Sequence, residues 1–301
     1  GERPMSWNFA YDSPSAIKFL LDAQGLAMSK KFGQNFLLST PVKERIINAL
    51  EMEEGMDIWE IGPGIGALTT LLLAKGVLVK TFEIDHGFCR ILRDFAFKDE
   101  PSFSLVEGDV LKTMDKQKDI PSRICGNLPY NVGSVVLAKL LEGDCRPPLM
   151  VFTLQKEVVA RLCATVRDKN WSSLSLLCQM DYQCKALFDI KGGCFYPEPT
   201  VTSSVIQLRK REKGLVDPLL RDDFLLVVRD LFALRRKTIK NNLSQGKCGS
   251  RLAKGGLERM LADSGVDPSL RAEQLDWPQF IALAQSFSTH ASICPSDNTS
   301  N

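Results

Sequence analysis

The chain has 301 residues, 44% of them hydrophobic and 25% charged, which is enough to bury one α/β core and to leave a smaller second domain. No apolar run approaches the ~18 residues that a membrane span requires, and the N-terminal residues lack the charged-then-apolar pattern of a signal peptide. The acidic residues Glu2, Asp12 and Asp22 also argue against an organelle transit peptide. We therefore expect a cytoplasmic protein without a membrane segment.

The cysteines and histidines argue against two further classes of protein. Nine cysteines without a Cys-x-x-Cys pair are typical of a reducing compartment and not of a disulfide framework. The only histidines are His86 and His290, so a histidine-based zinc site or a Ser-His-Asp hydrolase lacks the residues that it needs. We expect no bound metal.

Two helix starts come first along the chain. Asp12-Ser13-Pro14 combines a capping residue with a proline in the first turn, and it predicts a short helix that ends near Gly25. Ser39-Thr40-Pro41 predicts a second helix in the same way. Between them, the periodicity breaks around Gly33-Gln34-Asn35.

From residue 56 onward, short apolar runs alternate with helical segments. We expect strands at residues 56–61, 77–84, 103–106, 123–125 and 149–154, with helices at 67–74 and 132–141 among the connections. This alternation predicts a parallel sheet with helices on both faces. Two later runs, 182–190 and 201–208, predict an antiparallel pair that closes the sheet edge.

The C-terminal third has a different pattern. Apolar residues recur at helical spacing through residues 224–243, 252–261 and 280–287, which predicts a small helical domain. We therefore expect domains at 1–208 and 209–301, with a loose tail beyond residue 288. The net charge is only +2, but the segment from Arg209 to Arg259 holds 14 Lys/Arg against 6 Asp/Glu, so positive charge gathers in this domain.

A glycine-rich segment, residues 60–66, follows the first predicted strand of the sheet and opens a helix. Its sequence, Glu-Ile-Gly-Pro-Gly-Ile-Gly, allows a tight turn and a close approach of the backbone to a ligand. Taken alone, Gly62 and Gly64 are also explained by an ordinary strand-to-helix turn or by the dinucleotide site of an NAD enzyme. Glu83 ends the next strand, where a carboxylate can accept hydrogen bonds from both hydroxyls of a ribose, so the ligand is expected to be a nucleoside.

A third carboxylate, Asp109, follows the next strand at the same edge of the sheet. There it could accept a hydrogen bond from the adenine amine of a cofactor. Taken alone, Asp109 is better explained as a structural aspartate in a turn.

The segment Asn127-Leu-Pro-Tyr130 follows the fourth strand, beside the expected cofactor. An adenine amine is a poor nucleophile because its lone pair is delocalised into the ring. The Asn127 side-chain oxygen and the Leu128 carbonyl could bind its two N–H groups and direct the lone pair at a methyl sulfonium. Pro129 would fix that carbonyl and Tyr130 would offer a stacking face. An ordinary Asn-Pro turn explains neither the tetrapeptide nor its position.

These segments together resemble the ribosomal RNA adenine dimethyltransferase family, whose members dimethylate two adjacent adenines near the 3′ end of small-subunit rRNA. The resemblance covers nearly the whole chain and lies in residues 31–37, 60–69, 83–85, 108–109, 127–130, 154–161, 195–203 and 235–243. It departs from many relatives at residues 170–173, and residues 5–28 are variable in such enzymes.

The resemblance implies a Rossmann-like class I methyltransferase with a seven-stranded, mainly parallel sheet and a small C-terminal helical domain. It implies S-adenosyl-L-methionine as cofactor, with Asn35 and Leu37 closing over its methionine end, Gly62 and its neighbours beneath, and Asp109 at its adenine. Phe195 would stack on the flipped target adenine, unless it is a core aromatic. The implied substrate is small-subunit rRNA in a pre-30S particle, methylated by a monomer.

The basic residues of the C-terminal domain gain a role from the same resemblance. We expect Arg235, Arg236, Lys237 and Lys240 to lie in one helical segment that docks on rRNA, where the alternative is a solvated helix face. Lys30 and Lys31 would extend this surface.

Three rival functions remain at this point. A large-subunit adenine methyltransferase that confers macrolide resistance shares the cofactor motifs. A non-catalytic RNA-binding assembly factor or transcription factor could keep the fold without the activity. An NAD oxidoreductase would leave residues 127–130 without a role.

Overall fold

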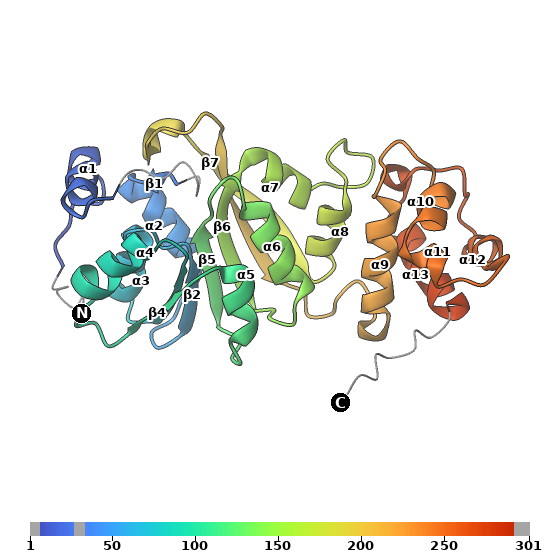
Figure 1. The fold of residues 1–301 in the computed structure, drawn as a ribbon, viewed down its shortest axis with the longest axis horizontal. Helices are drawn as coiled ribbons and strands as arrows, with labels where there is room; N and C mark the ends of the chain where they lie inside the picture. Colours follow the sequence, from blue (N-terminus) through green and yellow to red (C-terminus); the bar gives the residue numbers. More distant parts are fainter. Residues whose placement is uncertain (1–6, 27–33, 292–301) are drawn as a thin grey trace. The chain divides into compact units, whose positions relative to one another are not determined.

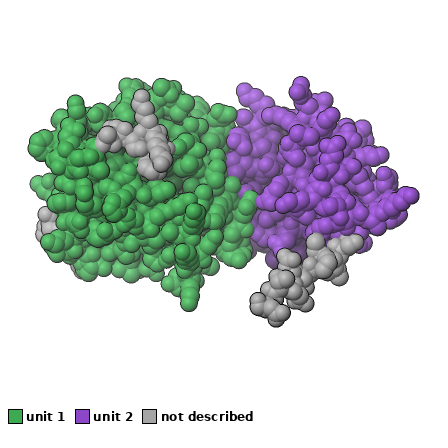
Figure 2. Space-filling view, viewed as in Figure 1, with its two compact units in different colours: residues 1–160, 183–210 green, residues 161–182, 211–301 purple. Residues whose placement is uncertain are grey.

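The computed structural model describes residues 7–26 and 34–291 of the chain, and its elements are labelled in Figure 1. The chain forms two compact units, which Figure 2 distinguishes by colour. The first unit comprises residues 1–160 and 183–210, and the second comprises 161–182 and 211–301. Within the described residues, no helix combines the length and the apolar character needed to cross a bilayer.

A seven-stranded sheet forms the centre of the first unit. Its strand order is β4-β3-β2-β5-β6-β9-β7, in which the first five strands are parallel and β9 runs antiparallel to β6. The prediction of a mainly parallel seven-stranded sheet with the last two strands at one edge is confirmed, and each strand end lies within two residues of its expected position. The strands are β2 (Asp57–Ile61), β3 (Leu78–Glu83), β4 (Phe103–Glu107), β5 (Arg123–Asn127), β6 (Leu149–Gln155), β7 (Tyr182–Ile190) and β9 (Ser203–Lys210).

The helices of the first unit begin where the capping residues predict. The Ser13 hydroxyl accepts a hydrogen bond from the Ala16 amide at 3.2 Å, and Ser39 accepts one from Val42 at 3.4 Å. These caps open α1 and α2. The helices of this unit are α1 (Pro14–Ala23), α2 (Thr40–Ala49), α3 (Ala67–Ala74), α4 (His86–Ile91), α5 (Val110–Thr113), α6 (Gly133–Glu142) and α7 (Lys156–Leu162). The last two residues of α7 belong to the second unit. A short π-helix (Leu92–Ala96) extends α4.

The core lies between the central strands and the helices that cover them. Ile58, Val79, Cys125 and Val151 come from four adjacent strands and are at most 1% exposed. They share one cluster with apolar residues of α2 and α3, so these helices pack on the same face of the sheet. This packing fixes the carboxyl ends of the strands, where the polar motifs follow.

The second unit is helical. It contains α8 (Ser173–Gln179), α9 (Arg221–Leu231), α10 (Ile239–Gln245), α11 (Lys247–Ser250), α12 (Gly256–Ser264) and α13 (Trp277–His290). Trp171 is 2% exposed, donates its indole N–H to the Leu275 carbonyl at 3.0 Å and packs its ring against Trp277. Such contacts group residues 161–182 with the C-terminal helices, whereas the sequence led us to expect one division at 208/209.

The expected continuous helix over residues 224–243 is wrong. Helix α9 ends at Leu231 and α10 starts at Ile239. The buried Asn242 side chain forms hydrogen bonds with backbone groups at the end of α9 and in the turn that follows. Its amide nitrogen donates to the Leu231 and Leu234 carbonyls at 2.8 and 3.0 Å, and its oxygen accepts from the Leu234 amide at 3.2 Å. The spacing of apolar residues could not predict this break, because the break depends on hydrogen bonds from a polar side chain.

Two other expectations about this unit change at the helix ends. Helix α12 begins four residues after the expected start at 252, because Gly255 adopts a left-handed conformation with φ of 71° before it. The expected loose tail beyond residue 288 overlaps the last turn of α13, where the His290 ring lies 2.5 Å from the Asp263 carboxylate. Residues 292–301 lie outside the described part of the chain.

Candidate active site

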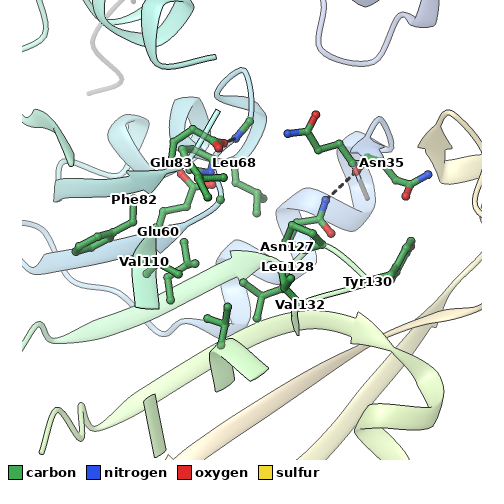
Figure 3. Close-up of a pocket in the computed structure, with 18 of the residues that line it drawn as sticks. Asn35, Glu60, Leu68, Phe82, Glu83, Val110, Asn127, Leu128, Tyr130 and Val132 are labelled. Carbon is green, nitrogen blue, oxygen red and sulfur yellow. Dashed lines mark hydrogen bonds between the residues drawn. The ribbon is translucent and has the colours of Figure 1, made fainter. Parts of the chain in front are cut away.

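A cavity of about 340 Å³ lies at the carboxyl ends of β2, β3, β4 and β5. In parallel sheets this edge is where loops present ligand-binding groups. The cavity brings together nearly all the site residues predicted for the cofactor and the target base. They are Asn35, Leu37, Gly62, Gly64, Glu83, Asp109, Asn127, Leu128, Pro129 and Tyr130. Figure 3 labels five of them: Asn35, Glu83, Asn127, Leu128 and Tyr130.

The glycine-rich segment forms a tight turn between β2 and α3. Gly62 and Gly64 have φ of 69° and 60°, a region that side chains strongly disfavour. A Cβ atom on Gly62 would come 3.8 Å from the Asn127 carbonyl oxygen, and one on Gly64 would come 3.4 Å from the Phe36 ring. The absence of side chains therefore keeps the backbone accessible from the cavity.

Glu83 is held at the end of β3 by two backbone amides. One carboxylate oxygen accepts from the Gly64 N–H at 2.9 Å and the other from the Asp85 N–H at 3.0 Å. The side chain is only 4% exposed, and burial raises its pKa to about 7 against the lowering effect of these bonds. Each oxygen keeps a lone pair that can accept a hydroxyl, so this carboxylate is a preorganised acceptor.

Glu60 lies one residue before the end of β2, near Glu83, and also lines the cavity. The Thr69 hydroxyl donates to its carboxylate at 2.5 Å, which ties β2 to α3. Glu60 is 1% exposed; burial raises its pKa to about 8, and the nearby Glu83 charge adds to that rise. Two acidic groups thus lie at one end of the cavity in an environment that disfavours their charged forms.

Asp109 fits both interpretations that the sequence left open. Its carboxylate accepts from the Leu111 amide at 3.0 Å and caps α5, as a structural aspartate does. It also lines the cavity beside Val110. The cap bond engages one carboxylate oxygen, so a structural role and a place in the cavity wall are compatible.

Asn127 to Tyr130 form the turn after β5. The Asn127 amide nitrogen donates to the Asn35 carbonyl at 3.1 Å, the dashed bond in Figure 3, which leaves the amide oxygen on the opposite side of the group. The Leu128 N–H donates to the Thr153 carbonyl at 3.2 Å, and the Pro129 carbonyl accepts from Gly133 at 2.9 Å. The turn is therefore fixed at both ends.

Tyr130 completes this side of the cavity. Its hydroxyl is hydrogen-bonded to the Ser203 hydroxyl, and burial raises its pKa. This bond fixes the ring from outside the turn. The aromatic face that Tyr130 presents to the cavity is thus held by the sheet edge as well as by its own turn.

Comparison with known proteins identifies the family. Residues 25–288 match the family described as ribosomal RNA adenine dimethylase. The chain is also 39% identical over 282 residues to the ribosomal RNA small subunit methyltransferase A of Treponema denticola, covering 91% of this chain and 94% of the relative.

The chain belongs to the ribosomal RNA adenine dimethylase family. The predicted family and enzyme class are thereby confirmed, and an NAD oxidoreductase is ruled out as an interpretation of the glycines.

Solved structures show the same fold. A dimethyladenosine transferase from Plasmodium falciparum superposes with a TM-score of 0.67 at 22% identity, covering 83% of this chain and 96% of that one. The 23S rRNA methyltransferase ErmE superposes with a TM-score of 0.58 at 22% identity, covering 84% and 100%. Both likenesses support the predicted class I methyltransferase fold.

In this adenine dimethylase, Phe195 does not line the cavity. It pairs with Leu37 where the two-residue strands β1 (Phe36–Leu37) and β8 (Phe195–Tyr196) run antiparallel. Its ring is 3% exposed in the core cluster that contains Leu37, so the expected stacking position is corrected to a core position. Side chains alternate along a strand, and Tyr196 therefore takes the opposite face.

The basic residues expected to dock on rRNA do not lie in one helical segment, and they differ in how far they are engaged by other protein groups. Arg235, Arg236 and Lys237 lie in the turn between α9 and α10 and not within a helix; only Lys240 is helical. Arg235 is engaged: its guanidinium lies 3.1 Å from the Glu273 carboxylate and donates to the Lys169 carbonyl at 3.0 Å. Arg236, Lys237 and Lys240 are exposed. Lys30 and Lys31 lie outside the described residues.

Sequence reasoning missed the apolar walls of the cavity. Phe36, Leu68, Phe82 and Ile84 all line it, and each directly adjoins or lies close to a motif residue in the chain. A signal was present, because an apolar residue next to a predicted ligand-binding residue lies close to the same edge of the sheet.

Proposed function

We propose that this adenine dimethylase binds S-adenosyl-L-methionine in the cavity and methylates the N6 amines of two adjacent adenines near the 3′ end of small-subunit rRNA. The Treponema denticola relative, whose name specifies the small ribosomal subunit, supports this choice of substrate. We further propose that the substrate is a pre-30S particle and that the enzyme acts as a monomer.

The cavity residues fit this cofactor. Two glycines with left-handed φ leave a cradle that Cβ atoms would narrow, and Glu83 presents two oxygens already oriented by backbone amides. Glu83 would hold the ribose, Asp109 the adenine amine, and Asn35 with Leu37 the methionine end. When bound, S-adenosylmethionine supplies an electrophilic methyl group on a positively charged sulfur.

The observation that carries the proposal is the fixed turn after β5. The Asn127 amide is oriented by its bond to Asn35, so its oxygen can accept one N–H of the target amine while the Leu128 carbonyl accepts the other. Both acceptors localise the lone pair of the amine on nitrogen. Tyr130, whose hydroxyl is tied to Ser203, would stack on the base.

Catalysis then depends on positioning. The amine proton can leave to solvent after methylation, because N-methylation makes the nitrogen acidic, so no strong base is required. The target adenine must leave its helix to reach the cavity, as base-modifying enzymes require. We propose that Arg236, Lys237 and Lys240 contact rRNA phosphates during docking, together with Lys30 and Lys31.

The test is incubation with methyl-labelled S-adenosylmethionine and, separately, unmethylated small and large ribosomal subunits, followed by nucleoside analysis of the rRNA. We expect label in N6,N6-dimethyladenine of the small subunit. Label only in the large subunit would assign the enzyme to the macrolide-resistance methyltransferases. Cofactor binding without label in either RNA would support a non-catalytic assembly factor instead.

A further inference from the structure

The N-terminal segment of residues 7–26, here called the N-terminal strap, contacts the glycine-rich turn from outside the cavity. The Tyr11 hydroxyl donates to the Ile65 carbonyl at 2.9 Å and accepts from the Trp7 indole N–H at 3.1 Å. Tyr11 is 7% exposed, and burial raises its pKa to about 12. The phenol is therefore a neutral, fixed donor to a peptide group of the turn.

Gly66, the last glycine of the turn, is confined by the same contact. A Cβ atom there would lie 2.8 Å from the Phe97 ring and 3.0 Å from the Tyr11 oxygen. Phe97 follows the π-helix, where its N–H donates to the Leu92 carbonyl at 3.0 Å. The end of the turn is thus held between one aromatic residue of the strap and one that follows the π-helix.

The other end of the strap contacts α4, the helix that follows Glu83, at its first turn and at its last turn. The Arg90 guanidinium donates to the Gln24 carbonyl at 2.9 Å. Leu26 packs so closely on Gly87 that a Cβ atom there would come 2.3 Å from its side chain. The strap therefore contacts both segments that present cofactor-binding groups, the glycine-rich turn and the segment after β3.

We propose that the N-terminal strap positions these two segments for cofactor binding and that Tyr11 is a positioning residue. The identity of the ligand rests on the proposed function, while the contacts do not. Tyr11 and α1 precede residue 25, where the match to the family begins. The family motifs therefore do not account for this support of the cofactor turn.

The hydroxyl of Tyr11 matters because Ile65 immediately precedes Gly66 in the turn. Removal of the O–H leaves the buried Ile65 carbonyl without that donor, a change that favours rotation of the peptide group toward another partner. The turn then populates conformations that are unsuited to the cofactor. Affinity falls, while chemistry in the occupied site is retained.

The test compares Tyr11→Phe with Tyr182→Phe, which removes the hydroxyl of another buried tyrosine, at the start of β7. Isothermal titration with S-adenosylhomocysteine should show roughly fivefold weaker binding for Tyr11→Phe, the size expected for one hydrogen bond. The KM for S-adenosylmethionine should rise by the same factor with kcat unchanged. Tyr182→Phe should bind S-adenosylhomocysteine as tightly as the wild type does, even if its Tm falls as far as that of Tyr11→Phe.

Arg90→Ala probes the other end of the strap at an exposed position and should weaken binding about twofold. It keeps the proposal testable if Tyr11→Phe does not fold. Normal affinity in a folded Tyr11→Phe variant would overturn the role of the strap but not the proposed function. If Tyr11→Phe does not fold, normal affinity in Arg90→Ala would have the same meaning. A wild-type protein that binds no S-adenosylhomocysteine would instead overturn the proposed function, and with it the role of the strap.

Discussion

The cavity of the first unit and the basic turn of the second, residues 232–238, use polar side chains in opposite ways. In the cavity, Glu83 is 4% exposed and both its oxygens are held by backbone amides. In the basic turn, Arg236 and Lys237 are exposed. Group transfer needs reacting atoms placed in advance, whereas contact with a polyanion needs only charge within reach. The contrast predicts large, local effects of substitution in the cavity and small, salt-dependent effects in the turn.

The largest effect should follow from Asn127→Ala. Loss of the amide oxygen removes one of the two proposed acceptors for the target amine, so single-turnover methylation should fall roughly 100- to 1,000-fold. Affinity for S-adenosylhomocysteine should stay within a few-fold of wild type. Asn48→Ala, at an exposed position of α2, is the matched control and should be fully active. Normal turnover of Asn127→Ala would remove its assigned role.

Glu83→Gln should act on cofactor binding. An amide cannot accept from both backbone N–H groups and two hydroxyls as a carboxylate can, so Kd for S-adenosylhomocysteine should rise about 10- to 100-fold. Glu107→Gln is the control, since that carboxylate ends the neighbouring strand but binds His86 and Arg93. Equal losses in both variants would argue against a specific contact.

The pKa of Glu83 adds a pH dependence to this prediction. Because burial raises it to about 7, the carboxylate that we propose as acceptor of the ribose hydroxyls becomes protonated as the pH falls through that value. Wild-type affinity for S-adenosylhomocysteine should therefore decrease from pH 8 to pH 6, and Glu83→Gln should show a flatter profile. Parallel profiles would contradict the assignment.

In the basic turn, the double variant Arg236→Ala/Lys237→Ala should weaken rRNA binding only several-fold. The slope of log K against log salt should become shallower by about one to two, as expected for two lost phosphate contacts. Cofactor affinity should not change. Lys116→Ala/Lys118→Ala removes the same charge from an exposed segment of the first unit and should leave the slope as it is.

The smallest expected effect is on the free energy of unfolding, whose pH dependence should differ between the buried Glu60 and an exposed glutamate. Its folded pKa, about 8, lies above its ordinary value of 4.5, so the folded state binds more protons and loses stability as the pH rises between these values. Urea unfolding at pH 5.5 and 8.5 should show a smaller loss for Glu60→Gln than for wild type. The exposed Glu53→Gln should follow wild type; an unchanged loss in Glu60→Gln would refute the buried-charge account.

The same contrast explains what the sequence could predict. The location of the cavity could be predicted from local sequence. Gly62, Glu83 and Asn127 each follow a short apolar run, and parallel strands bring such positions to one edge of the sheet. The predicted and observed bounds of β7 agree at both ends.

The expectations that failed depend on polar or pairing partners that apolar spacing does not reveal, most of them distant in the chain. Phe195 is buried because β8 pairs with β1, and the helix break at residue 232 depends on the amide of Asn242. Trp171 joins the second unit through Leu275, more than a hundred residues away. The alternating aromatics Trp7, Phe9 and Tyr11 were a visible signal, but nothing local identified Ile65 as the acceptor for Tyr11.

The proposed site is tested most directly by a crystal structure of the protein with S-adenosylhomocysteine and adenosine bound. We expect the ribose hydroxyls of S-adenosylhomocysteine on Glu83 and the amine of adenosine within hydrogen-bond distance of the Asn127 oxygen and the Leu128 carbonyl. S-adenosylhomocysteine bound away from Glu83, or an adenosine whose amine contacts neither acceptor, would contradict it.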